Sequence, residues 1–297
     1  DEHDLRVGEW GRWRWPEGFD PPGMLSDGSP EALSRLAMLK EVTEALEQLG
    51  EEAGECVFDL AARSCQALDL KFAFRYLDAA TWLPHVKYKP LSQYMLETLT
   101  WRLEQPLPFR WEGAGALLRG ELSTGKFVAH GKDRSGRPLV YIWPARENTW
   151  KPEQNIQALV YTFERAYQQN PGCLDVAVVV DCQGVGITNG PALGTISGLI
   201  NVLGSHMPRR LGFLAFTRAN YVFYSLWKVA ETMLSDVTRR KVTVLSSQGA
   251  ELREALTELI PPESLDDALG GDATINFDVD AYLADDPYLH GCEDVYG

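Results

Sequence analysis

The sequence predicts an α/β protein with a mostly parallel sheet, flanking helices and a separate helical lobe toward the N-terminal end. Residues 176–180 form an apolar, valine-rich run that Asp181, Gly184 and Gly186 end, as expected of a strand buried on both faces. From residue 133 onwards, predicted strands alternate with predicted helices, which is typical of parallel β-α-β units. Between residues 29 and 103 the apolar spacing indicates helices only.

The helical lobe is predicted to span residues 29–120. Ser29 is suited to cap its first helix and Pro30 to occupy the first turn, and apolar residues then recur at helical spacing until Gly50. Proline residues mark the connection between its last two helices. Three further helices are predicted in the lobe, at 57–68, 70–82 and 91–103.

Residues 1–28 are rich in Trp, Pro and Gly and form a predicted extended arm. The spacing of Trp10, Trp13 and Trp15 suits neither a regular helix nor a buried strand. These rings either dock on the protein or touch a membrane interface. We expect docking, because large apolar side chains are usually buried.

Residues 121–297 are predicted to form the α/β domain, whose last part is acidic. The pattern predicts strands at 126–130, 139–143, 177–180, 211–216 and 242–245, with a helix at 152–170.

The segment 219–234 is predicted to be an apolar helix, with Lys228 and Glu231 on its exposed side. A helix that is apolar around most of its circumference faces a core on one side and protein, ligand or membrane on the other. Its apolar residues are Tyr221, Val222, Phe223, Leu226, Trp227, Val229, Ala230, Met233 and Leu234.

The net charge of −14 is unevenly distributed. After Arg253 the chain has twelve acidic residues and no Lys or Arg, so this acidic part is a candidate surface for a protein partner. Residues 206–241 instead carry seven Lys or Arg against two acidic residues, a net charge of +5. Near an anionic leaflet each such charge contributes about 1 kcal/mol. We therefore expect transient docking on anionic membranes and no nucleic-acid partner.

The five cysteines lie at positions 56, 65, 173, 182 and 292, a spacing that matches neither a zinc site nor a disulfide framework. The longest apolar runs are shorter than the 18 or so residues needed to cross a bilayer, and the acidic start does not resemble a signal peptide. We expect a cytoplasmic, peripherally membrane-associated protein that needs no metal and no cofactor.

Enzymatic chemistry finds little support in the motifs. The glycine-rich turn at 184–190 resembles a dinucleotide-binding turn, but Asp181 stands close to where a pyrophosphate would lie, and residues 182–230 contain no Asp or Glu to bind a ribose. No Gly-x-Ser-x-Gly elbow is present, and the five histidines show no metal or triad spacing. The sequence therefore favours a protein without catalytic activity.

Five segments, in order and at suitable spacing, resemble the CRAL-TRIO (Sec14-like) lipid-binding and lipid-transfer family over roughly residues 56–282. The longest begins at Met207 and reads MPRRLGFLAFTRANYVFYSLWKVAETMLSDVTRRKVTVLS. The others are FRYL from Phe74 with TWR from Thr100, GKFVAHGKD from Gly125, GRP from Gly136, and LIPPE from Leu259 with LGG from Leu269.

The resemblance implies a protein that holds one hydrophobic ligand in an internal cavity and exchanges it between membranes. The ligand class it implies is a phospholipid such as phosphatidylinositol, and segment 219–234 corresponds to the gate helix of the family. The candidate residues for the cavity and gate are Val176, Val178, Phe216, Tyr221, Phe223, Leu226, Trp227 and Met233.

For the headgroup, the resemblance points to Thr238 and Lys241, where phosphatidylinositol-binding relatives carry Thr and Lys. Arg209 is a third candidate, although those relatives have Glu there, and Asp78 and Ala80 replace two of their arginines. The candidates for contact with the membrane are Lys228, Arg239 and Arg240.

Two alternatives remain open. Relatives that bind phosphatidylcholine carry hydroxyl side chains where this chain has Val176 and Val178, which indicates a more apolar ligand or a different headgroup pose. The protein is then a carrier of a hydrophobic molecule other than a phospholipid. Otherwise it is a lipid-sensing module that regulates a protein partner.

Overall fold

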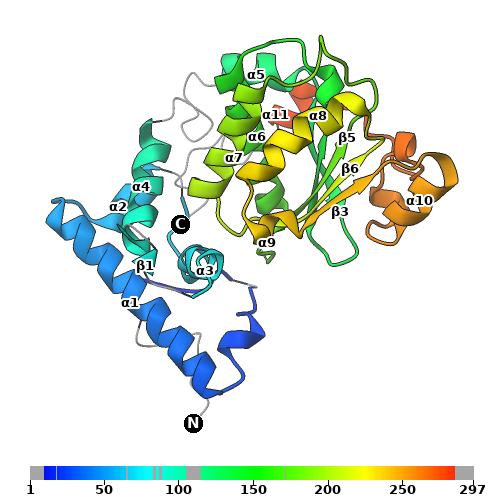
Figure 1. Ribbon diagram of the computed structural model, residues 1–297. Helices are drawn as coiled ribbons and strands as arrows, with labels where there is room; N and C mark the ends of the chain where they lie inside the picture. The colour runs from blue at the N-terminus through cyan, green and yellow to red at the C-terminus, as the bar shows by residue number, and fades with distance from the viewer. Residues whose placement is uncertain are drawn as a thin grey trace.

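The computed structural model describes residues 10–17, 19–64, 66–82, 85–86, 89–104, 115–170 and 172–284. The chain forms a helical lobe beside a larger α/β domain built on a five-stranded sheet (Figure 1). Cys65, Cys292, the first nine residues of the predicted arm and the end of the acidic part lie outside the described residues. Within the described ranges, no helix combines the length and the apolar character needed to span a bilayer.

The lobe begins at the predicted residue. The Ser29 hydroxyl accepts a hydrogen bond from the Ala32 amide at 3.1 Å, and Pro30 opens the first helix. A short antiparallel pair, β1 (His85–Val86) and β2 (Lys89–Pro90), connects the last two helices of the lobe. The described helices of the lobe are α1 (Pro30–Glu52), α2 (Val57–Arg63), α3 (Leu70–Ala79) and α4 (Leu91–Glu104).

Two helices of the lobe are shorter than predicted. The Ser64 hydroxyl donates a hydrogen bond to the Ala61 carbonyl at the end of α2, and Asp69 caps α3 by accepting from the Phe72 amide at 2.7 Å. Residues 66–69 accordingly form a connection and not a helix. Helix α3 ends before Thr81 and Trp82, which have positive φ angles of 54° and 61°.

The described part of the arm is docked on the lobe. Trp13 is 2% exposed, and its indole Nε1 donates a hydrogen bond to the Glu47 carboxylate at 2.6 Å. Its ring also contacts Phe58 edge-on, with 5.4 Å between centroids. Trp10 and Trp15 pack partly buried against the same apolar core.

The sheet has the predicted class and is mostly parallel. Its strand order follows the chain, and only the first pair is antiparallel. Its strands are β3 (Phe127–Lys132), β4 (Pro138–Ile142), β5 (Val176–Asp181), β6 (Leu211–Thr217) and β7 (Val242–Leu245).

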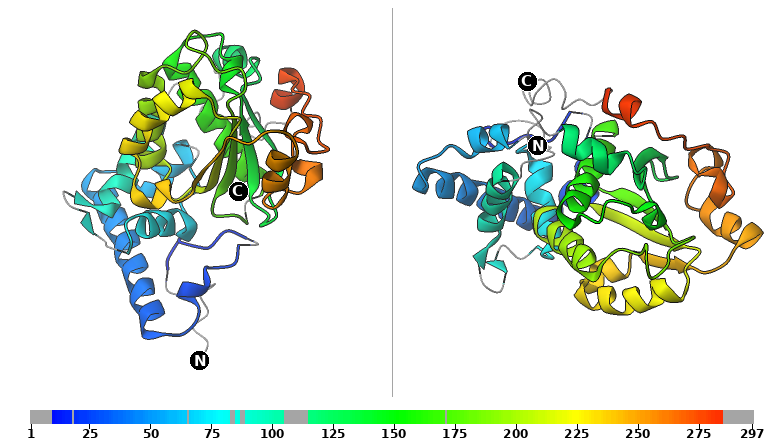
Figure 2. Two further views of the ribbon diagram at one scale, coloured as in Figure 1. Left: turned by 45° about the vertical axis from the view of Figure 1, so that its right-hand side comes forward. Right: turned by 90° about the horizontal axis from the view of Figure 1, so that it is seen from above.

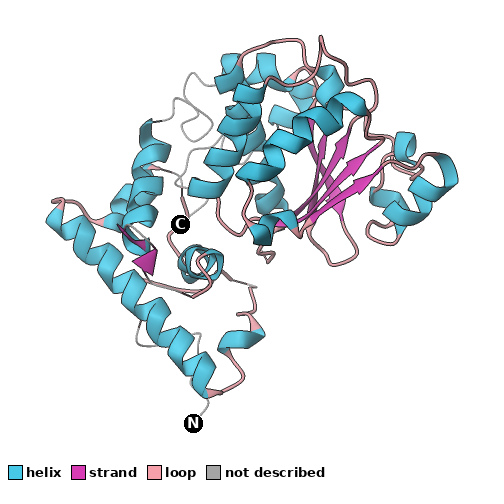
Figure 3. Cartoon of the chain, viewed as in Figure 1, coloured by secondary structure: helices cyan, strands magenta, loops and turns pink. Residues whose placement is uncertain are grey.

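Each face of the sheet has its own helical cover, as Figures 2 and 3 show. The crossover helices α6 (Pro152–Gln169), α7 (Leu193–His206) and α8 (Tyr221–Ala230) pack on one face. The opposite face is covered by α10 (Gly249–Thr257) and the segment that follows it. The short helices α9 (Asp236–Arg239) and α11 (Val279–Ala284) complete the domain with α5 (Gly115–Leu122) and the 3-10 segments η2 (Pro144–Arg146), η3 (Glu231–Met233), η4 (Pro262–Ser264) and η5 (Asp267–Leu269). The 3-10 segment η1 (Gly23–Leu25) lies in the arm, and its Leu25 packs in the core of the lobe.

Strand β5 shows how the sheet divides two apolar cores. Val176, Val178 and Val180 belong to the core under α6, α7 and α8. Ala177 and Val179 belong to the core under α10. This alternation explains the continuous apolar run in the sequence, because both faces of the strand are buried.

The predicted boundary at residue 120 falls inside α5. Leu118 and Leu122 of this helix are 2% and 1% exposed and pack in the core of the sheet domain. Helix α5 therefore packs with the α/β domain and not with the lobe.

Aromatic and ionic contacts join the lobe to the α/β domain. His206 at the end of α7 stacks on Trp101 of α4, with 4.2 Å between ring centroids and 5° between planes. Arg102 of α4 and Arg210 both contact the Glu164 carboxylate, at 3.3 and 2.9 Å. Burial would raise the pKa of Glu164, but the positive charges of Arg210 and Arg102 hold it below its usual value.

Candidate functional site

The candidate site lies on the face of the sheet that α7 and α8 cover. Phe216 of β6 faces α8, and its ring centroid lies 4.7 Å from that of Phe223 and 5.3 Å from that of Trp227. The Phe223 and Trp227 rings are stacked at 6.1 Å with 10° between planes. Three predicted residues thus form one aromatic cluster between sheet and helix, and Leu226 packs against the same core.

On this face of the sheet, apolar side chains are fully buried in the central strand β5 and only partly buried in β6 and β7. Val176 and Val178 in the central strand are 0% and 2% exposed, so the protein itself already encloses them. Apolar side chains on the outer strands and on α7 and α8 remain only partly buried against the same core. They include Leu199, Val202, Leu203, Leu211, Leu214, Phe216, Leu226, Trp227 and Val244.

The start of α8 is fixed to the neighbouring loop. The Asn220 side-chain oxygen accepts hydrogen bonds from the Val222 and Phe223 amides at 3.0 and 3.1 Å. Its Nδ2 donates to the Val185 carbonyl at 2.8 Å. This cap starts the helix at Tyr221, two residues later than the sequence predicted.

The predicted gate segment is also interrupted at its end. Helix α8 ends at Ala230, the single turn η3 follows, and Leu234 is extended. The Ser235 hydroxyl then accepts from the Thr238 amide at 3.2 Å and so caps α9. One continuous helix over 219–234 was therefore a wrong prediction.

The outer face of α8 carries apolar side chains in contact with solvent. Two predicted cavity residues are exposed to solvent: Tyr221 at the start of α8 is 72% exposed, and Met233 in η3, just after the helix, is 42% exposed. Tyr224 and Val229 are each 46% exposed. The helix is therefore apolar on its inner and its outer side.

Arg209 is held by carboxylates from two elements. Its Nε donates to Asp78 at the end of α3, and its Nη1 lies 3.1 Å from Asp175 Oδ2, just before β5. The residue has a positive φ of 58°, which places it in the left-handed region. The opposite charges of Asp78 and Arg209 thus neutralise each other within the protein.

Lys241 precedes β7 in a half-buried position near Arg209. Its Nζ donates a hydrogen bond to the Leu211 carbonyl at 2.6 Å. Burial, reinforced by the positive charge of Arg209, lowers the pKa of Lys241 below its ordinary value. The hydroxyl of Thr238, the second predicted headgroup residue, lies 2.9 Å from that of Ser235.

Most of the basic residues between 206 and 241 are already engaged. Arg210 contacts Glu164, Arg218 forms an ion pair with Asp181, and Arg209 and Lys241 have the partners described above. The three membrane candidates, Lys228, Arg239 and Arg240, are exposed. Arg239 also contacts Asp236 at 3.2 Å. The basic surface is thus smaller than the net charge of +5 indicated.

The glycine-rich turn after β5 does not form a phosphate cradle. Arg218 binds both carboxylate oxygens of Asp181 at the end of the strand, and Asn189 fills the turn with its own hydrogen bonds. Across the described ranges, no three His, Cys, Asp or Glu side chains come together as a metal site.

The sequence reasoning missed the pairing of Arg209 with Asp78 and the capping role of Asn220. A signal for the pairing was present, since both charged positions depart from the family pattern with opposite sign. Asn followed by an apolar helical run is also a standard capping signal.

Comparison with known proteins finds relatives whose similarity includes the candidate site. The family model described as CRAL/TRIO domain matches residues 122–271, just over half of the chain. Similar curated proteins include the CRAL-TRIO domain-containing protein C23B6.04c of Schizosaccharomyces pombe, which is 25% identical over 91% of this chain and 27% of its own length. Phosphatidylinositol transfer protein PDR17 of Saccharomyces cerevisiae is 27% identical, over 71% of this chain and 60% of its own.

Phosphatidylinositol transfer protein CSR1 of Eremothecium gossypii is also 27% identical, over 62% of this chain and 44% of its own. The chain therefore spans between about a quarter and three fifths of the length of these relatives. The crystal structure of Sfh5 shares the fold, with a TM-score of 0.59 and 15% identity over 82% of this chain and 88% of that one. The aromatic-lined sheet and helix thus lie in a matched domain, and the chain belongs to the CRAL-TRIO family of lipid-binding and lipid-transfer proteins.

Proposed function

We propose that the protein binds one hydrophobic ligand, a phospholipid such as phosphatidylinositol, between the sheet and helices α7 and α8, and exchanges it between membranes without chemical turnover. The observation that carries this proposal is the two-sided apolar character of α8. Its inner side holds the aromatic cluster around Phe223, and its outer side exposes Tyr221 and Val229. A helix of this kind is stable against ligand on one side and against lipid on the other.

The exposure of the apolar side chains supports this ligand position. The central strand is already covered by protein, whereas Leu214, Phe216 and Val244 toward the edge are not fully covered. Acyl chains placed there gain burial at about 25 cal/mol per Å2 of apolar surface. Displacement of α8 would open this region, and ligand and membrane would then compete for the apolar sides of the helix.

The membrane contact combines apolar and basic groups. Lys228, Arg239 and Arg240 are exposed on α8 and α9, beside the exposed apolar side of α8. An anionic leaflet attracts such charges by about 1 kcal/mol each. Because only these three basic side chains are exposed between 206 and 241, we expect a modest dependence on salt.

A second candidate function is the transport of a hydrophobic molecule other than a phospholipid. Two observations favour it. The Arg209 guanidinium already contacts two carboxylates, and the Lys241 ammonium already donates a hydrogen bond to a backbone carbonyl. A phosphate would have to compete with these partners.

Native mass spectrometry of the purified protein, followed by organic extraction and lipid analysis, tests the proposal. One stoichiometric phospholipid supports it, and phosphatidylinositol in particular supports Thr238 and Lys241 as headgroup contacts. A different hydrophobic molecule supports the second candidate. Uptake without transfer of labelled lipid between vesicles would indicate a lipid-sensing module, and a protein that takes up no offered lipid would contradict both carrier functions.

A further inference from the structure

Exposed apolar side chains gather in the loops at one end of the sheet. Strands β4, β5 and β6 are parallel, so the segments that follow them leave the same edge. Trp150 follows β4 and is 53% exposed, Ile187 and Leu193 follow β5 and are 81% and 48% exposed, and Tyr221 follows β6 and is 72% exposed. We call these four side chains the apolar tip.

The three loops of the apolar tip touch one another. A side chain added at Gly184 would lie 3.5 Å from Ala145, which precedes Trp150 in the β4 loop. The Val185 carbonyl accepts the hydrogen bond from Asn220, the residue before Tyr221. These contacts link the segments that carry the tip, from the β4 loop to the start of α8.

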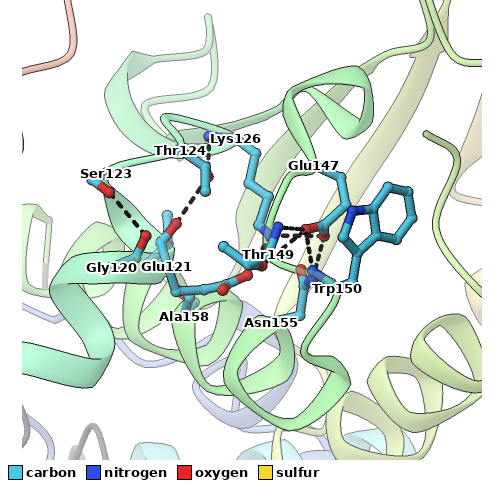
Figure 4. Close-up of polar contacts among 11 residues, drawn as sticks. Gly120, Glu121, Ser123, Thr124, Lys126, Glu147, Thr149, Trp150, Asn155 and Ala158 are labelled. Carbon is cyan, nitrogen blue, oxygen red and sulfur yellow. Dashed lines mark hydrogen bonds and ion pairs between the residues drawn. The ribbon is translucent and has the colours of Figure 1, made fainter.

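A buried ionic cluster holds the β4 loop rigidly (Figure 4). Glu147 Oε1 accepts from the Thr149 and Trp150 amides at 2.9 and 3.1 Å, while its Oε2 accepts from Lys126 at 2.8 Å and from Asn155. Burial would raise the pKa of Glu147, but the hydrogen bonds from Lys126 and Asn155 lower it to about 2. Figure 4 shows the Trp150 indole on the opposite side of the loop from Lys126.

The β5 loop is also fixed by its own hydrogen bonds. Asn189 Oδ1 accepts from the Gly186 amide at 2.6 Å, and its Nδ2 donates to the Gly184 carbonyl at 3.0 Å. The Gly190 amide donates to the Gly186 carbonyl at 2.8 Å. Ile187 lies within this turn, so the hydrogen bonds of the loop hold its side chain in the exposed position.

The charge pattern matches a lipid surface. The chain has 42 Asp and Glu among 297 residues, yet residues 182–230 contain none. Residues 182–208 contain no Lys or Arg either. At the β4 loop, Lys151 and Glu153 follow Trp150 with opposite charges. The segment 182–208, which carries Ile187 and Leu193, therefore brings no Asp, Glu, Lys or Arg side chain into an interface and avoids the cost of desolvating such groups.

We propose that the apolar tip inserts into the interface of a lipid bilayer, next to the outer side of α8. Trp and Tyr side chains suit this depth, because each joins a large apolar ring to a polar group. The basic residues of α9 lie at the other end of α8, so the helix is anchored at both ends. This inference rests on the proposed exchange at membranes and adds Trp150, Ile187 and Leu193, which lie outside α8, to the contact made by the helix.

Flotation of the full chain with vesicles of neutral phosphatidylcholine tests the tip, because neutral lipid removes the contribution of the basic residues. Leu193→Ser and Leu33→Ser form a matched pair, since Leu193 is 48% exposed and Leu33, on α1 of the lobe, is 49% exposed. We expect Leu193→Ser, Ile187→Ser and Trp150→Ser each to weaken binding roughly tenfold. Leu33→Ser should change it less than about twofold.

Quenching of tryptophan fluorescence by brominated phosphatidylcholine supplies a direct readout. We expect more quenching for the wild type than for Trp150→Phe, because the variant lacks the inserted indole. Equal quenching of the two proteins, or tip variants that bind like Leu33→Ser, would overturn the inference.

The transfer of labelled lipid, measured in parallel, separates this inference from the proposed function. If the wild type transfers lipid normally and the tip variants bind vesicles as the wild type does, only the proposed insertion of the tip is refuted. Absence of uptake and transfer in the wild type, with vesicle binding still lost in the tip variants, would refute the proposed function alone.

Discussion

Arg209 and Asp78 are 131 residues apart in the chain and form an ion pair that joins the end of α3 to the segment before β6. The pair connects the helical lobe to the α/β domain beside Lys241 and Asp175. It therefore occupies the place where the sequence predicted a headgroup contact, and its charges complement each other within the protein.

The ion pair makes a measurable contribution to stability. A double-mutant cycle of Arg209→Ala and Asp78→Ala should give a coupling free energy of roughly 1 kcal/mol, because both side chains keep partial contact with solvent. Urea unfolding measures it. Arg239→Ala with Asp236→Ala, an exposed pair on α9, should give less and serves as the control. Equal coupling in the two cycles would show that the interface pair has no special role.

Removing one carboxylate should also change lipid selection. Asp78→Asn leaves Arg209 with Asp175 alone and so raises the positive charge near Lys241. We expect a several-fold higher ratio of phosphatidylinositol to phosphatidylcholine uptake from mixed vesicles. An unchanged ratio would place the headgroup elsewhere.

The aromatic cluster should be essential for the attachment of α8. Phe223 is 7% exposed and contacts Phe216 and Trp227. Phe223→Ala is expected to reduce the free energy of unfolding by about 3–5 kcal/mol, through lost burial and the cavity left behind. Chemical unfolding gives this value, and Tyr224→Ala on the exposed side should cost much less.

His206 should make stability depend on pH. Burial lowers the pKa of His206 to about 4 from the 6.5 of an exposed imidazole, so the unfolded chain binds the proton more readily than the folded protein. The neutral form stacks on Trp101, and its contribution to stability is present above pH 6.5 and is lost as the pH falls toward 4. Melting temperatures of the wild type and His206→Gln across this range test the effect, and parallel curves would contradict it.

The Glu147 cluster should respond differently to acid. Its pKa of about 2 lies below the usual 4.5, so the stabilisation is present above pH 4.5 and is lost as the pH falls toward 2. At neutral pH we expect Glu147→Gln to reduce the free energy of unfolding by about 1–3 kcal/mol, because Lys126 loses one of its two carboxylates in a buried site and keeps Glu121. Glu153→Gln, an exposed change in the same region, is the control.

Much of the fold was predictable because its signals are local. Strand β7 was predicted with its observed bounds, and Ser29 capped α1 as its residue type indicated. The length of α2 was not predictable from periodicity alone, because Ser64 and Asp69 end and restart the helical backbone.

The site was less predictable, because its geometry depends on contacts between distant segments. The apolar pattern found Phe216, Phe223 and Trp227, but it could not distinguish them from the exposed Tyr221 and Met233 on the same segment. Only the folded chain shows that Arg209 meets Asp78.

The two covers of the sheet differ in when they become available during synthesis. Helices α6 and α7 lie between strands in the chain, so they leave the ribosome together with the sheet they cover. The opposite face, which includes Leu139, Ala177 and Val179, is covered by residues that follow β7. A nascent chain that has just completed β7 therefore exposes this apolar face until α10 emerges, and it is prone to aggregation in that interval.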